Sequence, residues 1–173
     1  PKTLTSAART QAGGNAGVGT FRILRQPYKL TLDVAEAKPQ VEVNSLTRLS
    51  VKRDVATLSA ELNYQVRRVG IFETRLTPPA GWTVTDVKGQ IDSWNLEGAD
   101  LVIKLPKQTA GDFKVNLTAR QTRKVATDDV TLPVFTPQNV TRHEALVGAT
   151  IHSSLEPNTK DLGDFQQEDV SAL

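Results

Sequence analysis

The stretch Val55–Val69, VATLSAELNYQVRRV, decides the fold of this chain. Apolar side chains occupy every second position within it and alternate with mostly polar ones; they are Leu58, Ala60, Leu62, Tyr64 and Val66. Such a period of two is typical of a β-strand with one buried face, whereas a helix would scatter the same residues around its circumference. The apolar face has to pack on a second layer, which we expect neighbouring segments to supply.

Further alternating segments recur at a spacing of roughly ten residues, with turn residues between them. They are Phe21–Arg25, Tyr28–Val34, Gln40–Arg53, Ile71–Leu76, Trp82–Val87, Ile91–Leu96, Leu101–Leu105, Phe113–Ala119 and Ala145–His152. No window shows a convincing helical period. The sequence therefore predicts an all-β fold, an antiparallel β-sandwich of immunoglobulin-like or related type with irregular termini.

Several finer features of the strands follow from the same pattern. The alternation breaks between Asn44 and Arg48, which favours a bulge or bend there. We expect Phe72 to point inward with Thr74 and Leu76. Residues 106–112 are expected to form a loop, and Glu97–Asp100 a tight turn. The segment Val130–Phe135 contains Pro133, which is typical of an edge strand or an extended crossover.

The two ends of the chain differ in composition from its middle. Residues 1–20 are small, polar and Gly-rich, which indicates a flexible lead-in. Residues 21–153 form the expected sandwich domain. Residues 154–173 carry five acidic side chains against the single Lys160, which indicates an extended acidic tail.

Charge and composition limit the classes of partner. Setting the tail aside leaves 20 basic and 14 acidic residues before position 154, a net charge of +6. Lys and Arg are the ordinary occupants of solvated strand faces, so we expect no nucleic-acid partner. No apolar run approaches the ~20 residues that span a bilayer, so no membrane insertion is expected. Cys is absent, which excludes disulfides and thiolate metal sites.

Residues suited to catalysis or metal binding form no recognisable motif. The pair His143-Glu144 begins a zinc-binding HExxH, but position 147 is Val, and the second histidine, His152, lies nine residues after His143. No GxSxG elbow is present. Asp86, Asp92, Glu97 and Asp100 lie near one another in sequence, but Glu97 and Asp100 are typical turn formers. We therefore predict no catalytic residue, no metal site and no cofactor.

Aromatic side chains offer one candidate ligand site. Exposed rings in β-sandwiches can stack on sugar faces. Tyr64 shares the apolar face of its strand and is expected in the core. Trp94 lies among polar neighbours, so a carbohydrate site would use Trp94 with Asp92 and Asn95.

The order of strands and turns over Tyr28–Ala119 resembles known modules. The stretches that carry the resemblance are YKLTLDV, LSAELNYQV, TRLTPPAGWTVTDV, DSWNLEG, LVIKLP and GDFKVNLTA. They resemble β-sandwich modules of large bacterial envelope proteins, and in pattern they are similar to the all-β N-terminal domain of HExxH zinc aminopeptidases. The HExxH helix has no counterpart in this sequence. The resemblance implies an accessory or scaffold domain and assigns no site residue.

We therefore expect a non-catalytic structural or interaction module. Met is absent, including at position 1, so we expect the chain to be part of a larger protein, exported to the periplasm or cell surface. Its edge strands would contact neighbouring domains or a partner chain. A carbohydrate-binding module and an accessory domain of a hydrolase are the alternatives.

Overall fold

The computed structural model of this chain describes residues 22, 24–27, 29, 31, 33, 35–124 and 130–156. The chain divides into two compact units, Pro1–Ala37 and Lys38–Leu173, and the strands of the described residues all lie in the second. The strand expected over Phe21–Arg25 is not formed at its described residues. The expected lead-in over residues 1–20, the inward residues of Tyr28–Val34 and the tail from residue 157 lie outside the described residues, so the domain boundaries stay predictions.

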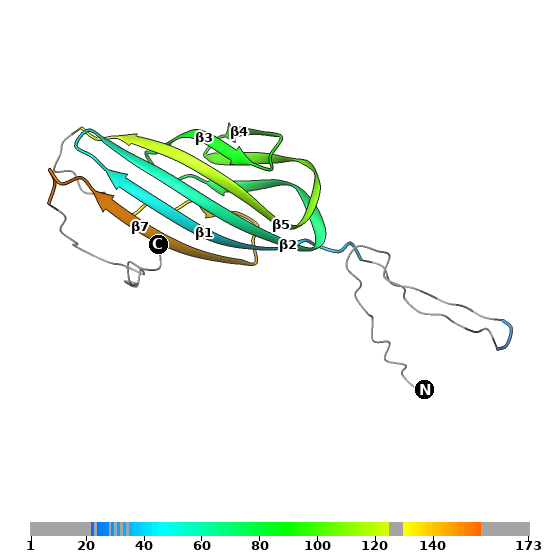
Figure 1. Cartoon of the computed structure of the whole chain (residues 1–173). Coiled ribbons are helices and arrows are strands. Elements are labelled where there is room, and N and C mark those ends of the chain that lie inside the picture. Colours follow the sequence, from blue (N-terminus) through cyan, green and yellow to red (C-terminus); the bar gives the residue numbers. More distant parts are fainter. Residues whose placement is uncertain are drawn as a thin grey trace. The chain divides into compact units, whose positions relative to one another are not determined.

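The second unit is built from strands alone within its described residues. They are β1 (Gln40–Val51), β2 (Val55–Thr77), β3 (Thr83–Gly89), β4 (Ser93–Glu97), β5 (Asp100–Thr122), β6 (Thr136–Pro137) and β7 (Arg142–Ile151). The hydrogen-bonded order is β3-β5-β2-β1-β7, while β4 also pairs with β5 and β6 with β2. In Figure 1, β7, β1, β2 and β5 lie side by side in this order.

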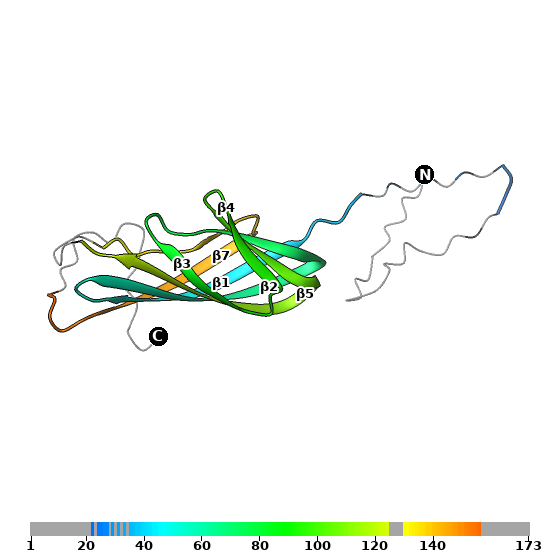
Figure 2. The same cartoon turned by 90° about the horizontal axis from the view of Figure 1, so that it is seen from above.

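Two long strands, β2 and β5, supply both layers of the sandwich. Val55–Val66 pairs without interruption with Gly111–Thr122, the register then shifts twice, and Glu73–Leu76 pairs with Leu101–Lys104. The larger layer holds β3, β1 and β7 beside the first pairing; the smaller layer holds β4 and β6 beside the second. Figure 1 shows both strands curling around at the end of the domain where they change layer, and Figure 2 shows that end from above.

Tyr64 shows that the two halves of β2 face each other. Burial raises the pKa of its phenol to about 12, while Thr74 of the same strand acts in the opposite direction. Ten residues of straight strand would hold these side chains roughly 33 Å apart. Their interaction therefore requires the strand to fold back over itself.

The core fills the space between the layers. Tyr64 stacks on Phe113, its cross-strand partner, with ring centroids 4.7 Å apart and planes 4° apart. Around them lie the buried aliphatic residues of β2 and β5, among them Leu58, Leu62, Leu76, Leu101, Ile103, Val115 and Leu117. The all-β sandwich and the core position of Tyr64 are thus confirmed.

One pairing departs from the expected antiparallel topology. β7 runs parallel to β1, from Glu42 beside Arg142 to Val51 beside Ile151, so the sheet is mixed. A parallel neighbour needs a long crossover, here from the end of β5 to β7. Alternation in Ala145–His152 shows that a strand exists, but it holds no information on its direction.

The prediction of a bulge or bend between Asn44 and Arg48 is wrong. β1 pairs with β2 residue by residue over its whole length. The inward positions between Val43 and Leu49 are Ser45 and Thr47, both buried. The polarity of these two small side chains made the alternation of apolar residues look interrupted, although the strand is regular.

Two further expectations differ from the structure. The loop expected at residues 106–112 is strand, since β5 is continuous through the change of layer. Phe72 points outward and is 64% exposed, because the register shifts on both sides of Ile71 leave it unpaired. Of the two alternatives for Val130–Phe135, an edge strand or an extended crossover, the structure has the second: the segment forms no strand and lies on the connection from β5 to β7, with Phe135 buried in the core. The tight turn between Glu97 and Asp100 is confirmed.

Gly70 lies where β2 changes layer, and this position should tolerate no side chain. A Cβ there would stand 2.9 Å from the backbone carbon and oxygen of Thr109 on β5. We expect Gly70→Ala to lower the free energy of unfolding by about 2–3 kcal/mol, since the two strands would have to separate. The control Gly98→Ala has open space and a φ of +64°, so only backbone strain of about 1 kcal/mol is expected. Urea unfolding measures both, and equal losses would contradict the close approach.

The raised pKa of Tyr64 predicts a loss of stability at high pH. The unfolded chain deprotonates near pH 10 and the folded chain near 12, so unfolding becomes easier as the pH rises between these values. Below pH 10 the contribution of the Tyr64 phenol to the free energy of unfolding is constant, and between pH 10 and 12 about 2–3 kcal/mol of it is lost. Tyr64→Phe keeps the stacked ring and removes this loss. Urea titrations of both proteins from pH 8 to about 12 would show parallel curves if the phenol were accessible to water.

Candidate functional site

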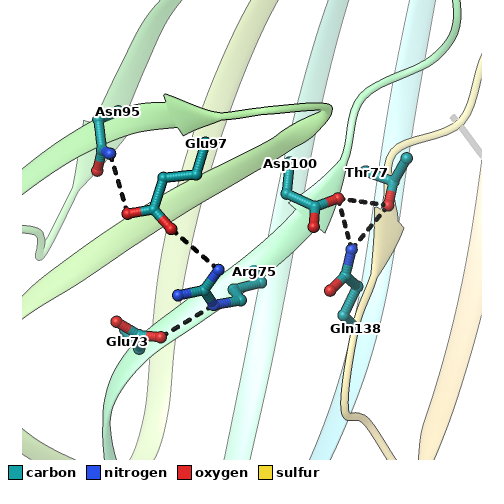
Figure 3. A network of polar contacts seen from close by, with 7 residues as sticks. All are labelled: Glu73, Arg75, Thr77, Asn95, Glu97, Asp100 and Gln138. Carbon is teal, nitrogen blue, oxygen red and sulfur yellow. Dashed lines mark hydrogen bonds and ion pairs between the residues drawn. The ribbon is translucent and has the colours of Figure 1, made fainter.

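The outer face of the smaller layer carries a network of polar side chains. Arg75 of β2 lies between two carboxylates, with Nε 3.0 Å from Glu73 Oε1 and Nη1 3.1 Å from Glu97 Oε2 on β4. Asn95 Nδ2 donates to Glu97 Oε1 at 3.2 Å. Figure 3 shows the chain of contacts from Glu73 to Asn95. β5 lies between β2 and β4, so Arg75 reaches across it.

The network covers an apolar side chain. Val102 of β5 stands between Arg75 and Asn95 in the strand register and has no exposed surface. It does not belong to the core cluster, which contains its neighbours Leu101 and Ile103, because it points to the opposite face. The aliphatic stem of Arg75 and the neighbouring polar groups therefore shield Val102 from water.

Ionisation in the network follows from its hydrogen bonds. The amide of Asn95 and then the guanidinium of Arg75 hold the pKa of Glu97 below its usual value. Glu73, followed by Glu97, raises the pKa of Arg75 above its usual value. Both shifts favour the charged forms of Glu97 and Arg75, so neither group is poised to exchange a proton with a substrate.

A second polar cluster fastens the end of the smaller layer. Gln138 Nε2 donates to Asp100 Oδ1 at 2.6 Å and to Thr77 Oγ1 at 2.9 Å, and Thr77 Oγ1 donates to Asp100 Oδ1 at 3.2 Å. The backbone N–H of Gln138 donates to the carbonyl of Arg75 at 2.9 Å. These contacts, drawn on the right of Figure 3, tie β6 to β2 and β5.

The residues of the expected carbohydrate site do not share one face. Trp94 is partly buried and packs against the core, opposite Ile103 in the register. Asn95, the next residue of β4, points to the other face and joins the Arg75 network. Asp92 is exposed and precedes the strand; its Oδ2 accepts from Ser93 Oγ at 3.4 Å, and its backbone N–H donates to the carbonyl of Lys104 at 2.8 Å. A sugar site built on this triplet stays a prediction.

The two histidines lie at opposite ends of β7 and do not converge. His143 Nε2 is 2.9 Å from Ser45 Oγ, and burial lowers the pKa of the imidazole. His152 Nδ1 is 2.8 Å from Ser154 Oγ. The described residues contain no group of three or more metal-ligating side chains. Within the described part of the chain, neither imidazole bonds to a carboxylate that would orient it for nucleophilic chemistry.

A depression marks the change of layer. It is open to solvent, has a volume of about 300 Å³ and is lined by Arg68, Val69, Gly70, Gln108 and Ala110. Gln108 Nε2 donates to the carbonyl of Gly70 at 3.1 Å. Sequence reasoning did not predict this surface, because the bend that creates it joins two strands that are far apart in the chain.

No family model matches this chain, and no curated protein matches it. Solved structures similar to it include an M1 zinc metallopeptidase from Deinococcus radiodurans, at 15% identity and a TM-score of 0.40; the match covers 50% of this chain and 21% of the peptidase. They also include a non-cellulosomal cohesin from Archaeoglobus fulgidus, at 15% identity and a TM-score of 0.41, over 66% of this chain and 93% of the cohesin.

A third similar structure is a type I cohesin–dockerin complex from Clostridium thermocellum, at 10% identity and a TM-score of 0.39, over 68% of this chain and 97% of the matched chain. The resemblance to a zinc peptidase noted in the sequence thus recurs among solved structures. This chain spans about a fifth of the metallopeptidases it matches.

No helix among its described residues is long and apolar enough to cross a bilayer.

The covering role of Arg75 can be separated from its charge. Arg75→Met keeps an unbranched apolar stem over Val102 and removes both ion pairs, which are exposed to solvent and screened. We expect its melting temperature to stay near that of the wild type, while Arg75→Ala lowers it by uncovering Val102. Thermal unfolding at low and high salt measures both. If Arg75→Met and Arg75→Ala lowered the melting temperature equally, the stabilisation by Arg75 would come from its ion pairs and not from shielding Val102.

Proposed function

We propose that this chain is a non-catalytic β-sandwich module that binds protein through its sheet edges, within a larger exported bacterial protein. The observation that carries the proposal is the contrast between its faces and its edges. Polar side chains on the face of the smaller layer are engaged with each other. The outer side of β7, in contrast, pairs with no strand of the described residues. Free backbone groups on a strand edge are a template for another chain.

Two further observations support a module without a reaction centre. The polar clusters described above fasten strands of the smaller layer to each other, whereas a catalytic site needs groups that converge on a cavity. The two histidines of β7 do not converge, and the described residues contain no group of three or more metal-ligating side chains. Export is supported by the resemblance to modules of bacterial envelope proteins, and fractionation of cells that produce the protein tests it.

Site-specific photo-crosslinking tests the proposal of edge binding. A photoreactive amino acid is placed at Thr150 on β7, at Thr85 on β3, or at Ser59 on the outer face of the central strand β2 as a control. All three side chains are exposed to solvent, and none belongs to the core cluster. After irradiation in cells, mass spectrometry identifies the captured chain. We expect one defined protein, which can be a second copy of this chain, at an edge position and none at Ser59.

Absence of a crosslink at both edges, or equal capture at Ser59, would contradict the proposal. Affinity electrophoresis in polysaccharide gels tests the carbohydrate alternative on the same protein. Retardation that is lost in Trp94→Ala would favour sugar binding over edge binding. A melting curve of this variant is needed, because Trp94 also packs against the core.

A further inference from the structure

The exposed edges of the two layers are protected unequally. β6 has two residues and contains Pro137, and β4 has five residues and ends at Glu97. β3 is interrupted by a register shift at Asp86, whose carboxylate pairs with Lys88 at 2.7 Å. Short length, proline, charge and irregularity are the devices that block pairing between sheet edges. Each of these three strands carries at least one of them.

β7 lacks these devices over most of its length. Its residues 145–151, ALVGATI, include no charge and no proline, and they pair with β1 without a register shift. Several of the side chains are of the β-branched or aliphatic kind that favours strands. Ile151 is among the exposed large hydrophobic residues, at 37% exposure. β7 is thus the edge of the described sheet best suited to accept another strand.

The hydrogen bonds to β1 show which backbone groups of β7 are free. The N–H of His152 donates to the carbonyl of Val51 at 2.9 Å. Since backbone groups alternate in direction along a strand, the even-numbered residues of β7 face β1 and the odd-numbered residues 143–151 face away from it. The outward groups of Ala145, Val147, Ala149 and Ile151 therefore form a regular row of donors and acceptors.

We propose that β7 pairs antiparallel with β7 of a second copy of this chain, about a two-fold axis at Gly148. This inference rests on the proposed function and names the partner of that edge. In this register residue i faces residue 296 − i of the other copy, so outward-facing residues meet each other, as an antiparallel ladder requires. The two larger layers then form one continuous sheet.

The side chains of β7 are complementary to themselves in this register. On the inner face, small residues meet larger ones: Ala145 faces Ile151, and Ala149 faces Val147. On the outer face, Leu146 faces Thr150. Glu144 faces His152, so no like charges oppose each other, and the two glycines at the axis bring no side chains into conflict. A partner of different sequence would gain no advantage from this symmetry.

Sedimentation velocity of the full 173-residue chain tests the proposal over a concentration series up to about 100 μM, since one pair of strands buries less area than a standard interface. We expect a concentration-dependent species with twice the monomer mass of 18.9 kDa. Ala149→Pro removes an outward N–H and no bond to β1, so it should stay folded by circular dichroism and become monomeric. A wild type that remains monomeric, or a folded Ala149→Pro that still dimerises, would overturn the inference.

Charge exchange tests the register itself. A chain with Leu146→Lys and Thr150→Lys should not self-associate, because the two lysines of one copy face those of the other. A chain with Leu146→Glu and Thr150→Glu should fail likewise, and a mixture of the two should form a heterodimer. The matched control, Thr83→Lys with Thr85→Lys, adds the same charge to the β3 edge and should dimerise like the wild type.

The outcomes distinguish this inference from the broader proposal. If the crosslink at Thr150 captures a different protein while the purified chain stays monomeric, self-pairing is wrong and edge binding stands. A mixture of Lys and Glu variants that does not associate, beside a dimeric wild type, would exclude the register centred on Gly148.

Discussion

The sandwich depends on the pairing of β2 with β5, which persists through a change of layer. One antiparallel pair supplies the centre of both layers, so the core closes between two halves of the same strands. The bend requires a close backbone approach at Gly70 and a left-handed conformation at Arg68, whose φ is 71°. If this pairing ended at Val66, the smaller layer would lose its two central strands, and Tyr64 would lose the surface that buries it.

The alternation of Leu58, Leu62 and Val66 was enough to predict the strand, its buried face and the two-layer fold. It could not give the continuity of β2 through Gly70 or of β5 through Pro106, because a bend of two paired strands looks in each sequence like a break between separate strands. Ser45 and Thr47 hid the regularity of β1, since burial of small polar side chains is set by their neighbours and not by their own polarity. The direction of β7 depends on the path of a long connection, which leaves no periodic trace.

The polar surface was harder to predict than the fold. Glu97 and Asp100 were correctly placed at a turn from their residue types. Their partners Arg75, Thr77 and Gln138 come from distant segments, and only the order of the strands brings them together. Trp94 and Asn95 are adjacent in sequence and both belong to β4. Because successive side chains of a strand point to opposite faces, these two cannot contribute to one site on a single face. Sequence inspection finds residues that are close along the chain, whereas a site on a sheet face is formed by residues of neighbouring strands.

The parallel arrangement of β1 and β7 gives the domain a mechanical character. The first strand begins beside Arg142 and the last strand ends beside Val51, so the chain enters the sandwich at one end of this ladder and leaves at the other. Tension applied to the two ends of the domain would pull β1 and β7 in opposite directions along their common axis. The evenly spaced hydrogen bonds of a parallel ladder would then bear the load together in shear, and would not open one after another as in an unzipped hairpin. This geometry is suited to a link in a chain that carries force.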